Sequence, residues 1–318
     1  MSNIKFLIFA LLSTSVIFFT SCDNDDDEPQ IIEEAQSIVD LALDTDDLSF
    51  LVDALTQTGL VGALQGPGPY TVFAPTNQAF QNLLDSNADW NSLSDIDNAT
   101  LSNILLFHVL GEAVMASDLS DKYQTTLSVG PNDESVVLQI DVTGGVKFNG
   151  SSEPTTTDIE ASNGVIHFIN EVMIPPSIVD LAVNGDVFSS LETALTRSDL
   201  TIDYVSILSD TGPFTVFAPT NQAFQNLLDS NSDWNTLNDI PVATLEAVLN
   251  YHVVQNANVQ SRQLTDDMEI TTLGGKMMTD LESGAKLETS SGQVVNIIVT
   301  NAQAINGVVH AVDAVLLP

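Results

Sequence analysis

The sequence predicts an α+β fold made of two tandem copies of one domain. Residues 71–90 recur at 215–234 with a single change, Ala88 against Ser232. In each copy, apolar residues first repeat with the 3.6-residue period of helices and later alternate with the two-residue period of strands. A chain of 318 residues is also long enough for about two domains.

The duplicated segment predicts a strand that runs into a helix. Residues 71–73 favour a half-buried strand, and Pro75 ends it because proline has no N–H to donate to a ladder. Thr76 or Asn77 is expected to cap the following helix. The apolar stripe of that helix is formed by Phe80, Leu83 and Leu84. The segment therefore looks like a packing junction, without a nucleophile or a metal ligand.

The first copy is expected to span residues 36–175. Helices are predicted at 38–42 and 48–55, and Asp95 or Asp97 is expected to cap another helix. Residues 136–142 alternate between apolar and polar types, which predicts a strand before a Gly144-Gly145 turn. The last strand is predicted at 165–172.

The second copy is expected to span residues 176–318. Pro175-Pro176 marks its start, and residues 177–182 repeat the pattern of 37–42. Pro241 suits the first turn of a helix, where its missing N–H has no partner in any case. Late strands are predicted at 294–300 and 308–316.

The N-terminus, residues 1–21, predicts an export signal peptide. Lys5 precedes an apolar stretch at 6–19, which is too short to span a bilayer about 30 Å thick as a stable helix. Residues 19–22 (Phe-Thr-Ser-Cys) resemble a bacterial lipobox, and Cys22 is the only cysteine in the chain. We therefore expect lipidation at Cys22 and attachment to a membrane through that anchor.

An acidic tether is expected at residues 22–35. Its run 23–28 contains five acidic residues and no apolar one, so like-charge repulsion favours a solvated spacer. Such a run is also similar to signals that send lipoproteins to the outer face of the outer membrane, whereas Asp23 beside the cysteine resembles an inner-membrane retention signal. We expect a location in the cell envelope, in the outer membrane and facing outward.

The charge excludes nucleic acid as a partner. The chain has 43 acidic and 7 basic residues and a formal net charge of −36, whereas binding to phosphate backbones needs a basic surface. Weak bridging of divalent cations by surface carboxylates remains an alternative. No Asp-x-Asp-x-Asp-Gly loop of a dedicated calcium site occurs in the sequence.

Three ordered motifs resemble signatures of the fasciclin-like (FAS1) domain family, and each occurs twice. The first is the duplicated segment 71–80. The second is Tyr251-His252, matched in the first copy by Phe107-His108, where phenylalanine replaces the usual tyrosine. The third is the Asn-Gly-apolar-apolar-His segment at 163–167 and 306–310. The resemblance implies a compact wedge of two β-sheets flanked by helices in each domain.

The sequence indicates no catalytic site. Its four histidines occupy repeat-equivalent positions, and none has the spacing of a zinc site: His108, His167, His252 and His310. A nucleophile elbow and a phosphate-binding loop are also missing from the sequence. We expect inward-pointing, neutral histidines, no cofactor, no metal and no enzymatic activity.

The resemblance to the FAS1 family implies adhesion to a cell surface or matrix. In animal relatives the tyrosine-histidine segment has been linked to integrin binding, so Tyr251, His252, Phe107 and His108 form a candidate adhesion motif. One alternative is a glycan-binding accessory lipoprotein of a polysaccharide-uptake system. Another is an enzyme with an unrecognised pair of carboxylates, because acidic residues are plentiful.

Overall fold

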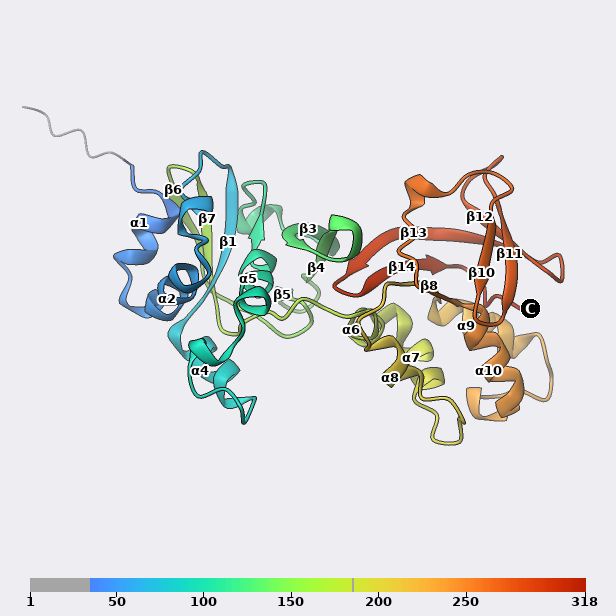
Figure 1. Cartoon of the computed structure of the whole chain (residues 1–318). Helices are drawn as coiled ribbons and strands as arrows, with labels where there is room; N and C mark the ends of the chain where they lie inside the picture. The colour runs from blue at the N-terminus through green and yellow to red at the C-terminus, as the bar shows by residue number, and fades with distance from the viewer. Residues whose placement is uncertain (1–34, 185) are drawn as a thin grey trace, which may run out of the picture. The chain divides into compact units, whose positions relative to one another are not determined.

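The structure, a computed structural model, describes residues 35–184 and 186–318 (Figure 1). The expected signal peptide and Cys22 lie outside these residues. The α+β fold is confirmed, because residues 36–175 and 176–318 each contain helices and a seven-stranded sheet. We call these two segments the first and the second repeat.

The first repeat begins with helices and ends with strands, but one strand, β1, interrupts its helices. Its helices are α1 (Ile38–Leu43), α2 (Ser49–Thr58), α3 (Val61–Leu64), α4 (Asn77–Asp85) and α5 (Asn98–Phe107). Its strands are β1 (Tyr70–Pro75), β2 (Val109–Leu110), β3 (Lys122–Val129), β4 (Ser135–Asp141), β5 (Lys147–Phe148), β6 (Pro154–Ala161) and β7 (Gly164–Ile169).

The second repeat follows the same plan. Its helices are α6 (Ile178–Asn184), α7 (Ser189–Leu195), α8 (Tyr204–Leu208), α9 (Asn221–Asp229) and α10 (Val242–Tyr251). Its strands are β8 (Phe214–Pro219), β9 (Val253–Gln255), β10 (Glu269–Thr272), β11 (Gly275–Asp280), β12 (Lys286–Thr289), β13 (Val294–Ala304) and β14 (Gly307–Val312).

The strand order is continuous within each repeat. In the first repeat it is β5-β4-β3-β2-β1-β7-β6, and in the second it is β10-β11-β12-β13-β14-β8-β9. The duplicated strand pairs in parallel with the last strand in both cases, as Val72 with Ile166 and Val216 with Val309. The resemblance implied a compact wedge of two β-sheets in each domain, and in each repeat the strands of this wedge follow one another in a single hydrogen-bonded order.

Strand β1 divides two apolar cores because successive side chains of a strand point to opposite faces. Val72 and Ala74 belong to the core under the helices, where α1 packs on β7 and α4 on β1 (Figure 1). Phe73 belongs to the core between the two halves of the sheet, and its ring centroid lies 4.5 Å from that of Phe148. Both faces of this strand are thus buried.

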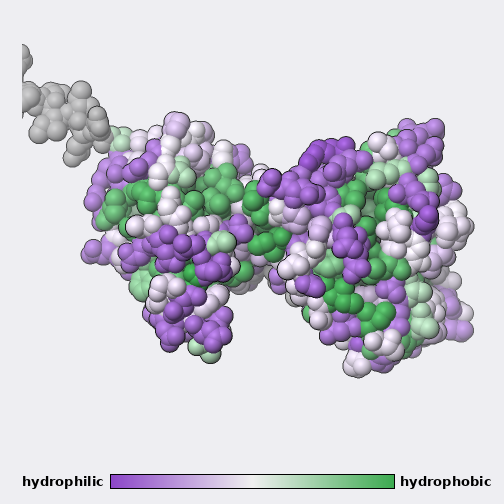
Figure 2. Space-filling view, in the orientation of Figure 1, coloured by the Kyte–Doolittle hydropathy of each residue, from purple (hydrophilic) through white to green (hydrophobic). Residues whose placement is uncertain are grey.

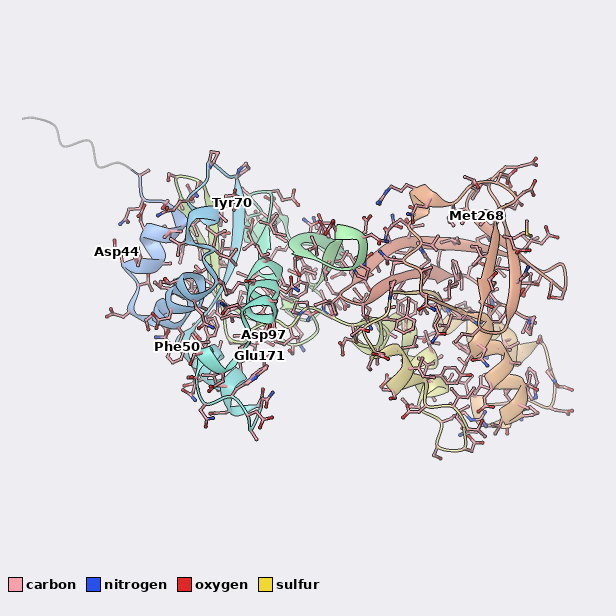
Figure 3. All side chains as sticks on the ribbon, viewed as in Figure 1. Asp44, Phe50, Tyr70, Asp97, Glu171 and Met268 are labelled. Carbon is pink, nitrogen blue, oxygen red and sulfur yellow. The ribbon has the colours of Figure 1, made fainter. Side chains whose placement is uncertain are left out.

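The predicted caps identify where the helices begin. The Thr76 hydroxyl accepts a hydrogen bond from Ala79 N–H at the start of α4. Asp97 caps α5 by accepting hydrogen bonds from the backbone N–H groups of Ala99 and Thr100, and Figure 3 places it at that end of the helix. Asp95 instead completes a capping box in the preceding 3-10 turn. Pro241 is the N-cap of α10, one residue before its predicted place in the first turn.

Candidate functional site: buried motifs and an open groove

His108 joins the end of α5 to the end of the first repeat. Its Nε2 accepts a hydrogen bond from Met173 N–H at 2.9 Å, so the proton lies on Nδ1, which donates to Ile104 O at 2.7 Å. The side chain is 1% exposed. Both ring nitrogens are therefore used inside the domain.

His252 repeats this arrangement in the second repeat. Nδ1–H donates to Val248 O at 2.7 Å, and Nε2 accepts from Leu316 N–H at 2.9 Å. Burial lowers the pKa of both His108 and His252 from 6.5 to about 4, because the charged ring would lose its hydration. The prediction that these two histidines point inward is confirmed, and the lowered pKa favours the neutral ring at pH 7.

His167 and His310 lie on the last strand of each repeat. His310 Nε2–H donates to Val259 O at 2.8 Å and its ring stacks on Phe217, with centroids 5.6 Å apart. His167 makes the same bond to Val114 O at 2.9 Å. Burial lowers the pKa of His310. These rings connect the last strand to the loop after β2 or β9, and they leave no ring nitrogen for a ligand.

Asn163 and Asn306 fasten the first helix of each repeat to the last strand. In the second repeat, Asn306 Oδ1 accepts from Ile178 N–H at 2.9 Å, while Nδ2 donates to Leu208 O at 2.7 Å and to Asp210 O at 2.8 Å. Asn163 makes the same three bonds in the first repeat. The motif around these residues is therefore a structural clasp.

The candidate adhesion residues all lie inside their domains. Phe107 and Tyr251 are 0% exposed, and His108 and His252 are 1% and 2% exposed. The Tyr251 hydroxyl donates to Lys276 O at 2.5 Å and accepts from Ser290 N–H at 3.1 Å. These side chains hold the fold together, and a partner would have to contact other residues of this structure.

The parts of the chain that the structure describes contain no cluster of three or more His, Cys, Asp or Glu residues that could hold a metal ion. Within the same ranges, 35–184 and 186–318, no helix has the length and apolar character needed to cross a membrane. The lipidation predicted at Cys22 falls outside these ranges.

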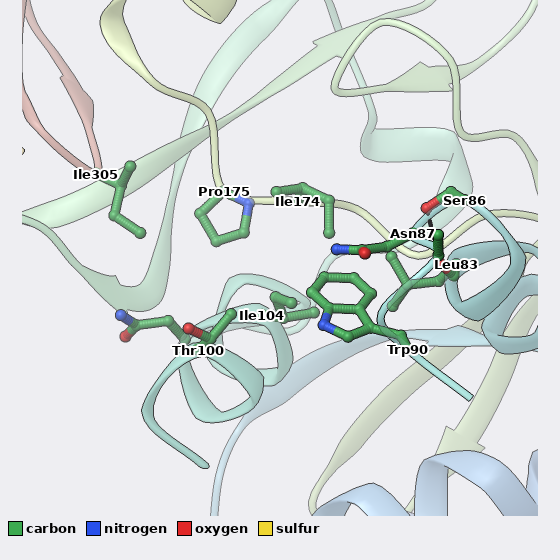
Figure 4. A pocket seen from close by; sticks show the side chains of 11 residues that line it. Leu83, Ser86, Asn87, Trp90, Thr100, Ile104, Ile174, Pro175 and Ile305 are labelled. Carbon is green, nitrogen blue, oxygen red and sulfur yellow. Dashed lines mark hydrogen bonds between the residues drawn. The ribbon is translucent and has the colours of Figure 1, made fainter. Parts of the chain in front are cut away.

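An open groove lies beside the duplicated segment, and the sequence did not indicate it. Figure 2 shows that hydrophobic residues reach the surface of both repeats among hydrophilic ones. Trp90, Leu83 and Ile104 of the first repeat line a hollow of about 590 Å³ together with Ile174 and Pro175 (Figure 4). Ile305, in the turn between β13 and β14 of the second repeat, also lines it. We call it the Trp90 groove. Its lining residues run from Leu83 to Ile305 in the sequence, and local pattern analysis does not connect residues so far apart.

Comparison with known proteins identifies the family. A family profile described as "Fasciclin domain" matches residues 46–175 and 186–318. The "Transforming growth factor-beta-induced protein ig-h3" of Sus scrofa is 30% identical over 266 residues, which cover 80% of this chain and 35% of that protein. The chain thus corresponds to about a third of this relative's length.

Shorter relatives and a solved structure also match. "Protein sll1483" of Synechocystis sp. is 34% identical over 144 residues, covering 45% of this chain and 76% of that protein. A FAS1 domain pair from the insect cell adhesion molecule fasciclin I covers 85% of this chain and 96% of its own, with 16% identity and a TM-score of 0.48. Fasciclin domains are adhesion-type modules without enzymatic activity. With two matches that together span most of its length, the chain belongs to the fasciclin family.

Proposed function

We propose that this chain is a cell-surface adhesion protein whose two fasciclin domains contact a surface or matrix ligand. The observation that carries the proposal is the match of two fasciclin domains over nearly the whole described chain. The dense acidic charge supports it, because a highly charged protein stays soluble and resists aggregation when it is displayed in quantity.

Adherence of whole cells tests this function. Cells that carry the chain should adhere to a matrix-coated or polysaccharide-coated surface more than cells from which its gene has been deleted. Restoring the full chain should restore adherence. Equal adherence of deleted and restored cells to every coating would refute the proposal.

Anchoring through Cys22 is the second part of the proposal. A single myristoyl-sized chain binds membranes only marginally, whereas several acyl chains on one residue hold a protein firmly. Cys22→Ala should move the protein out of the membrane fraction and abolish labelling by a clickable fatty acid. Ser21→Ala, which keeps a small residue before the cysteine, is the matched control and should change neither result. Membrane association that persists in the Cys22→Ala variant would contradict the anchor.

Outward display is the third part, and it rests on the acidic run 23–28. Replacing its acidic residues with Asn, Gln and Ser should retain the protein inside the envelope. Protease treatment of intact cells measures the displayed fraction. If the neutral variant is digested as readily as the parent protein, the run is only a spacer.

A further inference from the structure

We propose that the Trp90 groove binds a neutral carbohydrate. The proposal rests on the adhesion function above and names a ligand class for it. One wall of the groove is the indole of Trp90, which is half-buried and faces Ile104 (Figure 4). Ile174 and Pro175, with Ile305 of the second repeat, form the other side. Ile174 is 45% exposed, so the groove opens to solvent. Its volume of about 590 Å³ suits a small-molecule subsite.

The rim of the groove consists of uncharged polar groups. Ser86, Asn87, Thr100 and Asn103 supply hydroxyls and amides, and none of the eleven lining residues is charged. This neutrality is unusual for a chain with 43 acidic residues. A groove for a cation would be expected to use some of those carboxylates, and a groove for an anion would need basic groups.

One of these amides is available to a ligand. Asn103 lies half-buried on α5, and its side chain makes no hydrogen bond within the residues that the structure describes. Asn87 Oδ1 accepts from Asp89 N–H at 3.0 Å, and Asn87 O accepts from Trp90 N–H at 3.0 Å. The turn that carries Trp90 is therefore held in place, so the indole face is positioned before a ligand arrives.

A pyranose ring, like this groove, has an apolar face bordered by uncharged polar groups. Its axial C–H groups form an apolar face that can stack on the electron-rich face of an indole, while its hydroxyls point outward. Amide and hydroxyl side chains can both donate and accept, as sugar hydroxyls do. A neutral sugar could thus place its apolar face on Trp90 and its hydroxyls against Asn103.

The exposed surface of the adjoining helix supports a role in binding. Packing constrains buried positions, whereas exposed substitutions usually change stability by less than about 0.5 kcal/mol. The exposed residues of α4 are nevertheless identical in α9, while exposed strand positions elsewhere differ, as Thr155 does from Ile298. The identical exposed pairs are Gln78 and Gln222, Gln81 and Gln225, Asn82 and Asn226, and Asp85 and Asp229, followed by Ser86 and Ser230 just after the helices.

The second repeat offers a poorer version of the site. It retains a half-buried tryptophan at Trp234, but Ala247 occupies the position that corresponds to Asn103. The amide is therefore missing there. We expect the site in the first repeat to bind the ligand more tightly. The difference between Asn103 and Ala247 should account for much of the difference in affinity.

Tryptophan fluorescence tests the proposal directly, because the chain has only two tryptophans. In a full-length Trp234→Phe variant, Trp90 is the sole tryptophan, so a saturable emission change on titration reports this groove. The probes are neutral hexasaccharides of glucose, mannose and xylose, with polygalacturonate as the acidic comparison and decaproline as a peptide comparison. At least one neutral probe should bind, and adding Asn103→Ala should weaken it about tenfold, as expected for one lost hydrogen bond.

The matched control is Asn238→Ala, which removes an exposed amide outside the groove and outside α4. It should leave affinity unchanged, and the thermal transitions of both asparagine variants should match that of the parent. No saturable change with any neutral probe, an undiminished affinity in Asn103→Ala, or binding of decaproline alone would overturn the inference. If cells still require the chain for adherence in any of those cases, the proposed function stands and only the ligand class falls.

Discussion

Replacing Asn306 with alanine should destabilise the second repeat by about 3 kcal/mol. The side chain is 5% exposed and satisfies three backbone groups, two of them in buried hydrogen bonds. A buried polar group left without a partner costs about 1–3 kcal/mol, and water can reach Asp210 O because its bond is only part-buried. The total loss of unfolding free energy should therefore be smaller than the cost of three fully buried, unpaired polar groups. Against a typical unfolding free energy of 5–15 kcal/mol, the domain should still fold.

Urea unfolding followed by fluorescence measures this loss one repeat at a time. Trp234 reports the second repeat in a Trp90→Phe background, and Trp90 reports the first in a Trp234→Phe background. Asn306→Ala should lower the second transition, and the equivalent Asn163→Ala should lower the first. Asn235→Ala is the control, because its exposed side chain has no such role and a change within about 0.5 kcal/mol is expected. Equal stability of Asn306→Ala and Asn235→Ala would refute the clasp.

A charge variant separates the hydrogen bonds from simple packing. Asn306→Asp keeps the shape but, when ionised, points a carboxylate at Leu208 O and Asp210 O, which are both acceptors. Burial should raise the pKa of the new carboxyl above its unfolded value of about 3.9. Its protonated form can donate a hydrogen bond, so stability relative to the parent should be greatest below that value and fall as pH rises through the folded pKa. A constant deficit between pH 4 and 7 would contradict this reasoning.

Three further substitutions test other contacts. Gly307→Ala would place a Cβ 2.2 Å from a backbone oxygen of β8 and should lower the free energy of unfolding by more than about 3 kcal/mol. In Gly62→Ala, in α3, the new Cβ meets nothing within 4 Å, so the variant should be more stable by about 0.5–1 kcal/mol. Calorimetry compares the two variants. Tyr251→Phe should cost about 1 kcal/mol of unfolding free energy in urea, since Phe107 already occupies the equivalent position. His252 should make stability fall as pH drops from 6.5 toward 4, because the ring is protonated in the unfolded state but stays neutral in the folded state. His252→Ala should therefore show a smaller acid-induced drop in melting temperature than the parent. An equal drop would count against the buried neutral ring.

Much of the fold could be predicted where local pattern and packing agree. The duplicated segment has β-branched and aromatic residues, a proline stop and a threonine cap in succession, and the structure contains β1 and α4 at those positions. The strand predicted at 136–142 corresponds to β4 (Ser135–Asp141). Strand β6 was missed because its residues 155–158 are all exposed, so an edge strand without apolar alternation looks like a loop.

The site was harder to predict because its parts meet only in three dimensions. The histidine motif has a strong sequence signal, yet that signal reflects buried hydrogen bonds from His108 to Ile104 O and Met173 N–H. The Trp90 groove has no motif of its own. Its indole, the Asn103 amide and the exposed Ile174 belong to a turn, a helix and a terminal segment, and only packing brings them together.

The two repeats separate what this fold requires from what it tolerates. Both keep the parallel pair of first and last strands and the asparagine clasp. The equivalent strands also follow one another in the same order, but the two edges of the sheet differ. They are β5 and β6 in the first repeat, and β9 and β10 in the second. In the second repeat, β13 begins at Val294 and pairs with β12, whereas in the first repeat β6 begins at Pro154, and Ser152 before it forms only an isolated bridge with Phe148 of β5. The pairing between β5 and this segment is thus limited to the single bridge of Phe148 with Ser152. The asparagine clasp is the same in both repeats although the sheet opens at different edges, so the clasp does not depend on where the opening lies.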